Sequence, residues 1–250
     1  MSVEALIVLI VIFFLTSVVG VVTGSNSLIA VPVMFQVGMD PKVAIATNMF
    51  GLVFMAVGGT IPFVRAKKIE YAKVSPLIVL TLVSSAIGAL LVGIISNGGI
   101  KLIVSVAMIA VALFTLLKRD AGIAPTSGQR PYAKSLTYVL VFLLGIYGGL
   151  FSGGYVTILT AVCIGIYGMN YGEAVGSTKL INVFSSGIAT AIFMWQGLVD
   201  YRLGAIIGIT MFVGGYVGAH YATKLNDVWL RRIFLATVFI LAIKTLYDFW

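Results

Sequence analysis

The chain has 250 residues, of which 60% are hydrophobic and 10% charged, and its formal net charge at pH 7 is +8. Soluble domains typically carry about 25% charged residues, so this composition excludes a water-soluble fold. The Lys and Arg residues lie in short connections between apolar runs, without the interleaved aromatics of nucleic-acid-binding stretches. We therefore expect no nucleic-acid partner and attribute the basic residues to membrane topology.

Long apolar runs predict an all-α polytopic membrane protein, because about 20 residues at about 1.5 Å each cross a hydrocarbon core. Two shorter apolar pieces, 27–37 and 155–167, are too short for ordinary straight spans and either cross as broken helices or re-enter, giving about 8–10 crossings in all. The start of the chain lacks the basic region of a secretory signal, so we expect the first span to be retained. The expected long spans are 4–22, 43–64, 74–95, 101–118, 134–150, 173–195, 203–221 and 229–248.

A polar connection divides the chain near its middle. Residues 119–133 contain charged residues, glycine and proline, and they separate a first unit, 1–118, from a second unit, 134–250. We expect two transmembrane repeats joined by this cytoplasmic linker.

The two units match when one is moved onto the other by about 130 residues. This shift aligns Gly38-Met39-Asp40 with Gly168-Met169-Asn170, and Ile69-Glu70-Tyr71 with Val199-Asp200-Tyr201. Matches that keep one offset over such a distance indicate an internal duplication.

The orientation of the repeats depends on what the two short pieces do. If they cross, each unit has five crossings and the repeats are inverted, with connections 65–73, 118–134 and 222–232 all cytoplasmic. If they re-enter, each unit has four crossings and the repeats are parallel. The excess of Lys and Arg in cytoplasmic loops fits the inverted arrangement better by one residue, and this arrangement is preferred.

Two glycine-rich breaks interrupt the apolar pattern at equivalent places, in 20–27 and 145–155. Irregular backbone survives at membrane depth only where it is buried in protein or lines a polar cavity. Each break precedes a short helix, which Ser25, Asn26, Ser27 or Ser152 would cap, and the free N–H groups of a helix start attract anions. Close packing of helices through small residues is the alternative explanation.

A second pair of polar clusters begins the following long helices, at 44–48 and 174–179. Lys179 is the most informative residue, since a lysine inside a span usually faces a cavity or a counter-charge. The alternatives are that its amine reaches back to the membrane interface or pairs with Glu173.

These residues together resemble the sulfite exporter TauE/SafE family over nearly the whole chain. The resemblance rests on the repeated glycine-rich break, on Pro32 in the first short helix, and on the helix starts at 44–47 and 174–179. It implies transport of small sulfur-containing or organic anions such as sulfite or sulfonates. Where the family has a Gly-Gly-Gly run, this chain has residues 24–27, Gly-Ser-Asn-Ser, whose side chains would add hydrogen-bond donors, and the second unit lacks the proline after Gly153-Gly154.

The sequence thus predicts a non-enzymatic secondary transporter of a small anion in the inner (plasma) membrane, without a cofactor or metal. An anion channel and a non-transporting subunit of a larger complex are the alternatives. The anion, the direction of transport, a coupling proton or ion, and homo-oligomerisation are left open. The expected substrate-binding residues are Gly24, Ser25, Asn26, Ser27, Thr47, Asn48, Gly153, Gly154, Tyr155, Ser177, Thr178, Lys179 and Asn182.

Overall fold

The computed structural model describes residues 3–24, 26–117, 132–225, 229 and 232, and the regular elements in this part of the chain are all α-helices. The expected span 229–248 lies almost wholly outside the described residues. The helices are α1 (Val3–Thr23), α2 (Asn26–Gln36), α3 (Pro41–Arg65), α4 (Tyr71–Ile94), α5 (Asn97–Leu117), α6 (Ala133–Leu150), α7 (Tyr155–Gly165), α8 (Tyr171–Trp195) and α9 (Tyr201–Lys224).

Polar caps determine where the long helices begin. The Asp40 carboxylate accepts hydrogen bonds from the first N–H groups of α3, and Pro41 occupies the first helical position. Asn170 and Glu173 form a capping box at the start of α8. The Asp200 side chain accepts the Leu203 N–H at the start of α9. These charged and amide groups lie at helix ends, where they reach water, and the apolar helix interiors remain free for lipid and packing.

The helix bounds recur at the offset found in the sequence. Helix α3 spans 41–65 and α8 spans 171–195, while α4 spans 71–94 and α9 spans 201–224. The residues with positive φ recur in the same way: Gly24 and Gly154, Gly38 and Gly168, Lys67 and Gly197. Positions 130 residues apart are called equivalent positions below.

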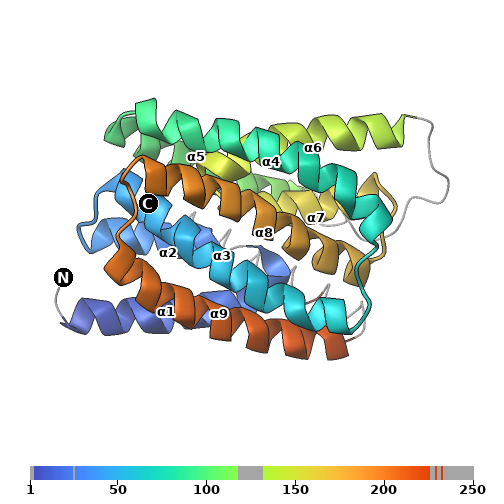
Figure 1. Ribbon diagram of the computed structural model, residues 1–250, viewed down its shortest axis with the longest axis horizontal. Coiled ribbons are helices and arrows are strands. Elements are labelled where there is room, and N and C mark those ends of the chain that lie inside the picture. Colours follow the sequence, from blue (N-terminus) through green and yellow to red (C-terminus); the bar gives the residue numbers. More distant parts are fainter. Residues whose placement is uncertain (1–2, 25, 118–131, 226–228, 230–231, 233–250) are drawn as a thin grey trace.

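Each short helix turns back along the helix that precedes it. The chain reverses at Gly24, and the end of α1 at Gly20 packs against Asn26 at the start of α2. Figure 1 shows α2 leading back toward the end of the molecule where α1 begins, and α7 leading back toward the end where α6 begins. The pairs α1–α2 and α6–α7 are therefore helical hairpins that enter from opposite ends.

Hydrogen bonds identify which connections share an end. At one end, called the Asp40 end, the Lys42 amine donates to the Gly93 carbonyl over 2.9 Å, and Asn97 donates to Asp40. At the other, the Lys68 end, the Lys68 amine donates to the Thr223 carbonyl over 3.3 Å. The connections after α3 and α9 thus lie together, as the inverted arrangement requires.

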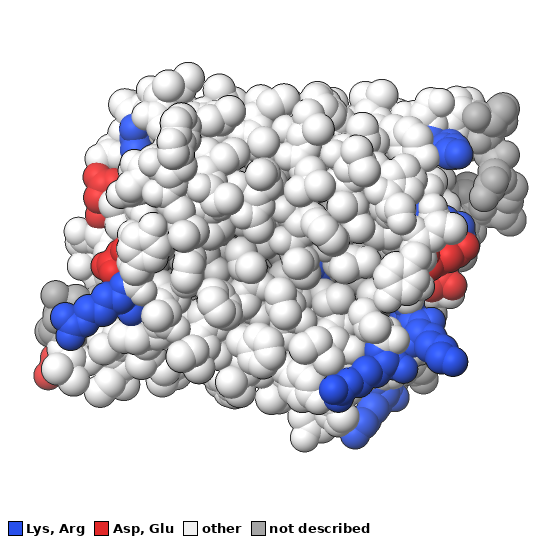
Figure 2. Space-filling view, in the orientation of Figure 1, with Lys and Arg blue, Asp and Glu red and all other residues white. Residues whose placement is uncertain are grey.

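The surface suits a bilayer. Figure 2 shows charged side chains gathered at the two ends of the molecule, with a wide band between them almost free of charge. Ile7, Val11 and Leu15 are exposed on one face of α1, which is the pattern of a lipid-facing helix. Among the described residues, α1, α3, α4, α6 and α9 are long and apolar enough to cross a membrane. The total number of crossings and their division into repeats remain predictions.

Glycines let the helices approach closely. A Cβ at Gly218 of α9 would collide with the Val18 carbonyl of α1, and a Cβ at Gly88 of α4 would collide with the Ile146 carbonyl of α6. Close backbone contact through small residues is the usual packing of membrane helices, since apolar side chains gain little by leaving lipid. The pairs α1–α9 and α4–α6 therefore pack at equivalent places.

Candidate functional site

The tips of the two helical hairpins meet in the interior. Gly24 has a φ of +73°, and a Cβ there would lie 2.7 Å from the Thr157 nitrogen of α7. The Thr157 hydroxyl donates to the Thr23 carbonyl over 2.6 Å. The break in the first unit is thus held against the start of the short helix in the second unit, at membrane depth.

A first polar group lies on the α2–α3 side of this meeting point. The Asn48 amide donates to the Ser27 hydroxyl over 2.9 Å, and Ser27 shares a hydrogen bond of 3.0 Å with Ser152. All three residues are buried. The amide oxygen of Asn48 has no hydrogen-bond partner, so it remains available to a ligand.

A second polar group lies at the equivalent place on the α7–α8 side. Thr160 and Thr178 share a hydrogen bond of 3.2 Å between their hydroxyls. The neighbouring Ser177 is fully buried, and its hydroxyl has no partner. An unpaired buried hydroxyl costs free energy unless a ligand or water satisfies it.

Lys179 is buried beside this second group. Its side chain is 2% exposed, and its amine has one recorded hydrogen bond, 3.5 Å to the Gly20 carbonyl of α1. Within the described residues, no carboxylate lies within 4.0 Å of the amine. Met49 occupies the equivalent position in the first unit. Among the described residues, Lys179 is therefore the basic group of this centre, and it lies on one side of it.

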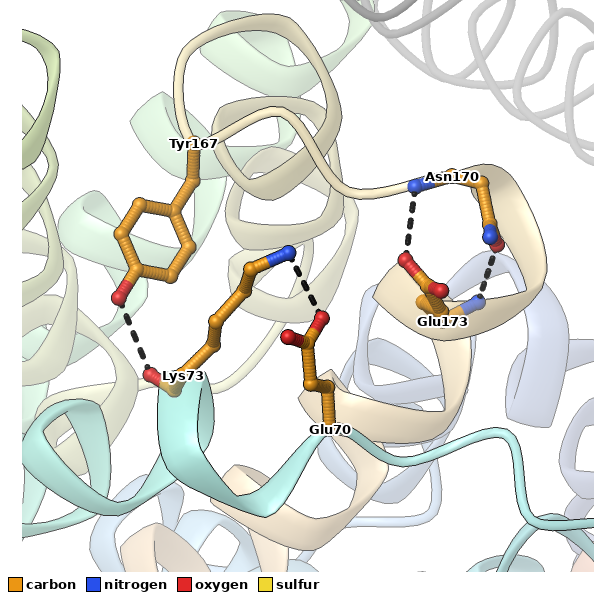
Figure 3. A network of polar contacts seen from close by, with 5 residues as sticks. All are labelled: Glu70, Lys73, Tyr167, Asn170 and Glu173. Atoms are coloured by element: carbon orange, nitrogen blue, oxygen red, sulfur yellow. Dashed lines mark hydrogen bonds and ion pairs between the residues drawn. The ribbon is translucent and has the colours of Figure 1, made fainter. Parts of the chain in front are cut away.

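Glu173 does not pair with Lys179, so that alternative is wrong. The Glu173 carboxylate accepts the Asn170 N–H over 3.2 Å, and the Asn170 side chain accepts the Glu173 N–H over 2.9 Å. Figure 3 shows this capping box near the ion pair of Lys73 with Glu70, 2.7 Å long, and the hydrogen bond from Tyr167 to the Lys73 carbonyl. This polar network ties the start of α4 to the connection between α7 and α8.

The Asn26 side chain, which was expected to bind the substrate, donates its hydrogen bonds to α1. Its amide nitrogen donates to Thr16 over 2.9 Å and to Ser17 over 3.1 Å, both in α1. The amide hydrogens thus hold α2 against α1 instead of facing an anion, and the amide oxygen is the atom left without a partner.

The expected capping of α7 by Ser152 is also wrong. Gly154 precedes α7 in a left-handed conformation and no side chain caps this helix start, because the Ser152 hydroxyl is engaged by Ser27.

The structure brings most of the expected site residues together and places others elsewhere. Gly24, Asn26, Ser27, Asn48, Ser177, Thr178 and Lys179 lie in or beside the groups described above, and Gly153 and Gly154 form the turn before α7. Thr47 instead accepts the Asp200 N–H at the Asp40 end, and Tyr155 lies beside Thr81 and Ser185, away from Lys179. Asn182 is buried one turn beyond Thr178. Ser25 lies outside the described residues.

Several polar residues of the interior were missed in the sequence. Thr16 and Ser17 interrupt an otherwise apolar span, and Thr160 interrupts the second short helix. A single hydroxyl in a span is common, because it can bond to its own helix backbone. The sequence offered one indication of their role, which is that all three residues lie close to a glycine-rich break.

The fold and this interior define a multi-pass helical membrane protein, in which broken helices bring polar groups and a basic group together at membrane depth. This arrangement is typical of transporters. The family model for "Sulfite exporter TauE/SafE" matches residues 9–245. The chain therefore belongs to the sulfite exporter TauE/SafE family and is a membrane transporter of this type.

Curated relatives carry transporter names. The chain is 26% identical over 236 residues to "Probable membrane transporter protein ORF9" of Sinorhizobium sp, covering 94% of this chain and 90% of that protein. It is 23% identical over 252 residues to a "Probable membrane transporter protein" of Haemophilus influenzae, covering 99% and 96%. It is 24% identical over 241 residues to "Probable membrane transporter protein YfcA" of Escherichia coli K12, covering 95% and 89%. No solved structure matches the chain.

Proposed function

We propose that this protein is a secondary transporter of a small anion of the sulfite or small-sulfonate type in the inner (plasma) membrane. The family description names sulfite export, and the proposal extends this chemistry to the polar centre between the hairpin tips. The anion would bind between the two units.

The single observation that carries the proposal is the environment of Lys179. A lysine inside a span is costly unless a counter-charge or polar cavity compensates it. Here the amine has one long hydrogen bond to a carbonyl and no carboxylate nearby among the described residues. A bound anion would provide the missing negative charge, while the unpaired hydroxyl of Ser177 would donate to one of its oxygen atoms.

The transport mechanism we propose is alternating access by two inverted repeats, 1–118 and 134–250, joined by a cytoplasmic linker, 119–133. The recurrence of helix bounds and positive-φ residues supports the duplication. The entry of the two hairpins from opposite ends supports the inversion. Rocking of one unit against the other would then open the centre to each side in turn.

Exchange in proteoliposomes tests this function. Vesicles containing the purified chain and loaded with unlabelled sulfite should take up external labelled sulfite faster than empty vesicles, because a carrier returns loaded. Lys179→Met should lose this exchange. Lys42→Met is its matched control, because Lys42 lies at the Asp40 end, and it should exchange like wild type. Saturable flux without acceleration by internal sulfite would indicate a channel. Absence of flux for sulfite, sulfate and small sulfonates would contradict the proposed function and favour a subunit role.

A further inference from the structure

Two equivalent contacts between long helices differ in chemistry. Between α3 and α9, Met55 and Met211 pack against glycines of the opposite helix. A Cβ at Gly51 would lie 2.5 Å from the Met211 sulfur, and a Cβ at Gly215 would lie 2.7 Å from the Met55 carbonyl oxygen. This contact is close and is made by methionine and glycine.

The equivalent contact between α4 and α8 contains hydroxyls instead. Thr81 replaces Met211, Ser85 replaces Gly215, and Ser185 replaces Met55. Ser85 and Ser185 share a hydrogen bond of 2.7 Å, and the Ser85 hydroxyl also lies 3.0 Å from the Gly145 carbonyl. The Tyr155 ring packs on Gly148 of α6, and Tyr155 lies beside Thr81 and Ser185. Thr81, Ser85, Tyr155 and Ser185, called the hydroxyl cluster below, are at most 1% exposed.

Two hydroxyls of this cluster, those of Thr81 and Tyr155, make no hydrogen bond of good geometry, and Tyr155 interacts with Thr81 and Ser185 only through weaker contacts. A threonine inside a helix usually bonds to the carbonyl four residues before it. Thr60, Thr137 and Thr210 do so in this protein, over 2.7 to 2.9 Å. Thr81 does not make this bond, so its hydroxyl is not held by its own helix and lies beside Tyr155 between α4 and α8.

The cluster lies farther along α8 than Lys179. Ser185 follows Lys179 by six residues, which is about 9 Å along α8 toward the Asp40 end. Asn182 lies midway on the same side of the helix and is buried. A ligand that leaves Lys179 in this direction meets hydroxyls at the α4–α8 contact, whereas the α3–α9 contact offers it methionine and glycine.

We propose that the hydroxyl cluster is a second binding station for the transported oxyanion, between Lys179 and the Asp40 end, and that the anion passes along α4 and α8. This inference rests on the proposed function. The cluster supplies O–H donors and contains no carboxylate, which suits the oxygen atoms of a small oxyanion. Its lack of a cation suits a transient station, because conduction requires binding weak enough to release the ion.

The competing explanation is that these hydroxyls only join helices. Two conservative variants separate the explanations: Thr81→Val keeps the side-chain shape and Tyr155→Phe keeps the ring, while each removes one unpaired hydroxyl. Ser84→Ala is the matched control, since Ser84 is buried in the same helix and bonds to carbonyls of its own helix, Leu80 over 2.9 Å and Thr81 over 3.3 Å.

The experiment measures labelled sulfite uptake into proteoliposomes and, in detergent, the rise in melting temperature produced by sulfite. Thr81→Val and Tyr155→Phe should each lower the maximal uptake rate per folded protein by about fivefold, the effect of one lost hydrogen bond in the rate-limiting step. Both should keep the sulfite-induced temperature rise that reports binding at Lys179. Ser84→Ala should match wild type in both measurements.

Uptake per folded protein within about twofold of wild type for both variants would overturn the second station while leaving the proposed function intact. Equal loss of uptake in Ser84→Ala would also overturn it, because a general packing defect would then explain the effect. Wild-type protein that transports no sulfite, sulfate or sulfonate would instead refute the proposed function and the station with it.

Discussion

Replacement of Lys179 by methionine should stabilise the protein while removing its response to sulfite. Burial of a lysine at the centre of a membrane helix costs about 2.5–3.5 kcal/mol. A hydrogen bond between membrane helices returns only about 0.6 kcal/mol on average, and the bond from Lys179 to Gly20 is long at 3.5 Å. Methionine occupies the equivalent position 49, and its unbranched side chain has a shape similar to that of lysine. Lys179→Met should therefore raise the free energy of unfolding by about 2 kcal/mol.

The assay is thermal unfolding of the purified protein in detergent, with and without sulfite. A gain of about 2 kcal/mol corresponds to a rise of about 4–8 °C in melting temperature for a chain of this size. Sulfite at about 100 times its Kd should stabilise wild type by about 2.7 kcal/mol and leave the variant unchanged. Lys42→Met serves as the control, with a small change in stability and a full response to sulfite.

A lower melting temperature in Lys179→Met would refute this reasoning, because the amine would then be holding the fold together. An undiminished response to sulfite in the variant would show that the anion binds elsewhere.

Two further predictions concern the break and the topology. Gly24→Ala should reduce the yield of folded protein far more than Gly38→Ala. Both glycines have positive φ, which costs alanine about 1–3 kcal/mol of strain, but only a Cβ at position 24 would meet the backbone of α7. Equal yields of the two variants on a size-exclusion column would contradict this. In a Cys163→Ser background, Lys67→Cys and Lys224→Cys should both react with an impermeant maleimide only from the cytoplasmic side, and labelling of the two from opposite sides would contradict the inverted arrangement.

Apolar length and polar caps made most of the helices predictable from the sequence. Asp40 and Asn170 begin α3 and α8, two or three residues before the expected starts, because helix caps extend beyond the apolar run that marks a span. The path of the short helices was not predictable in the same way. A span followed by a re-entrant piece and a span followed by a crossing piece have the same apolar pattern, whereas the structure shows hairpins that return before reaching the far end.

The candidate site was predictable where polar residues cluster in the chain, and not where single residues meet across helices. Ser27, Thr178 and Lys179 stand in polar clusters, and the structure brings these clusters to the hairpin tips. Thr81 and Ser185 lie inside apolar spans with other hydroxyls nearby, Ser84 and Ser186 among them. Their meeting with Tyr155 depends on the packing of α4 against α8, which no local pattern encodes.

The central claim is that Lys179 binds a transported anion, and the most direct test is labelled sulfite uptake into proteoliposomes under an imposed membrane potential. A net negative charge moving inward gains about 2.3 kcal/mol per 100 mV of positive-inside potential. The account predicts saturable uptake by wild type, faster when the interior is positive, and its loss in Lys179→Met. Uptake by Lys179→Met equal to that of wild type, or no uptake of sulfite or sulfonates by wild type, would contradict it.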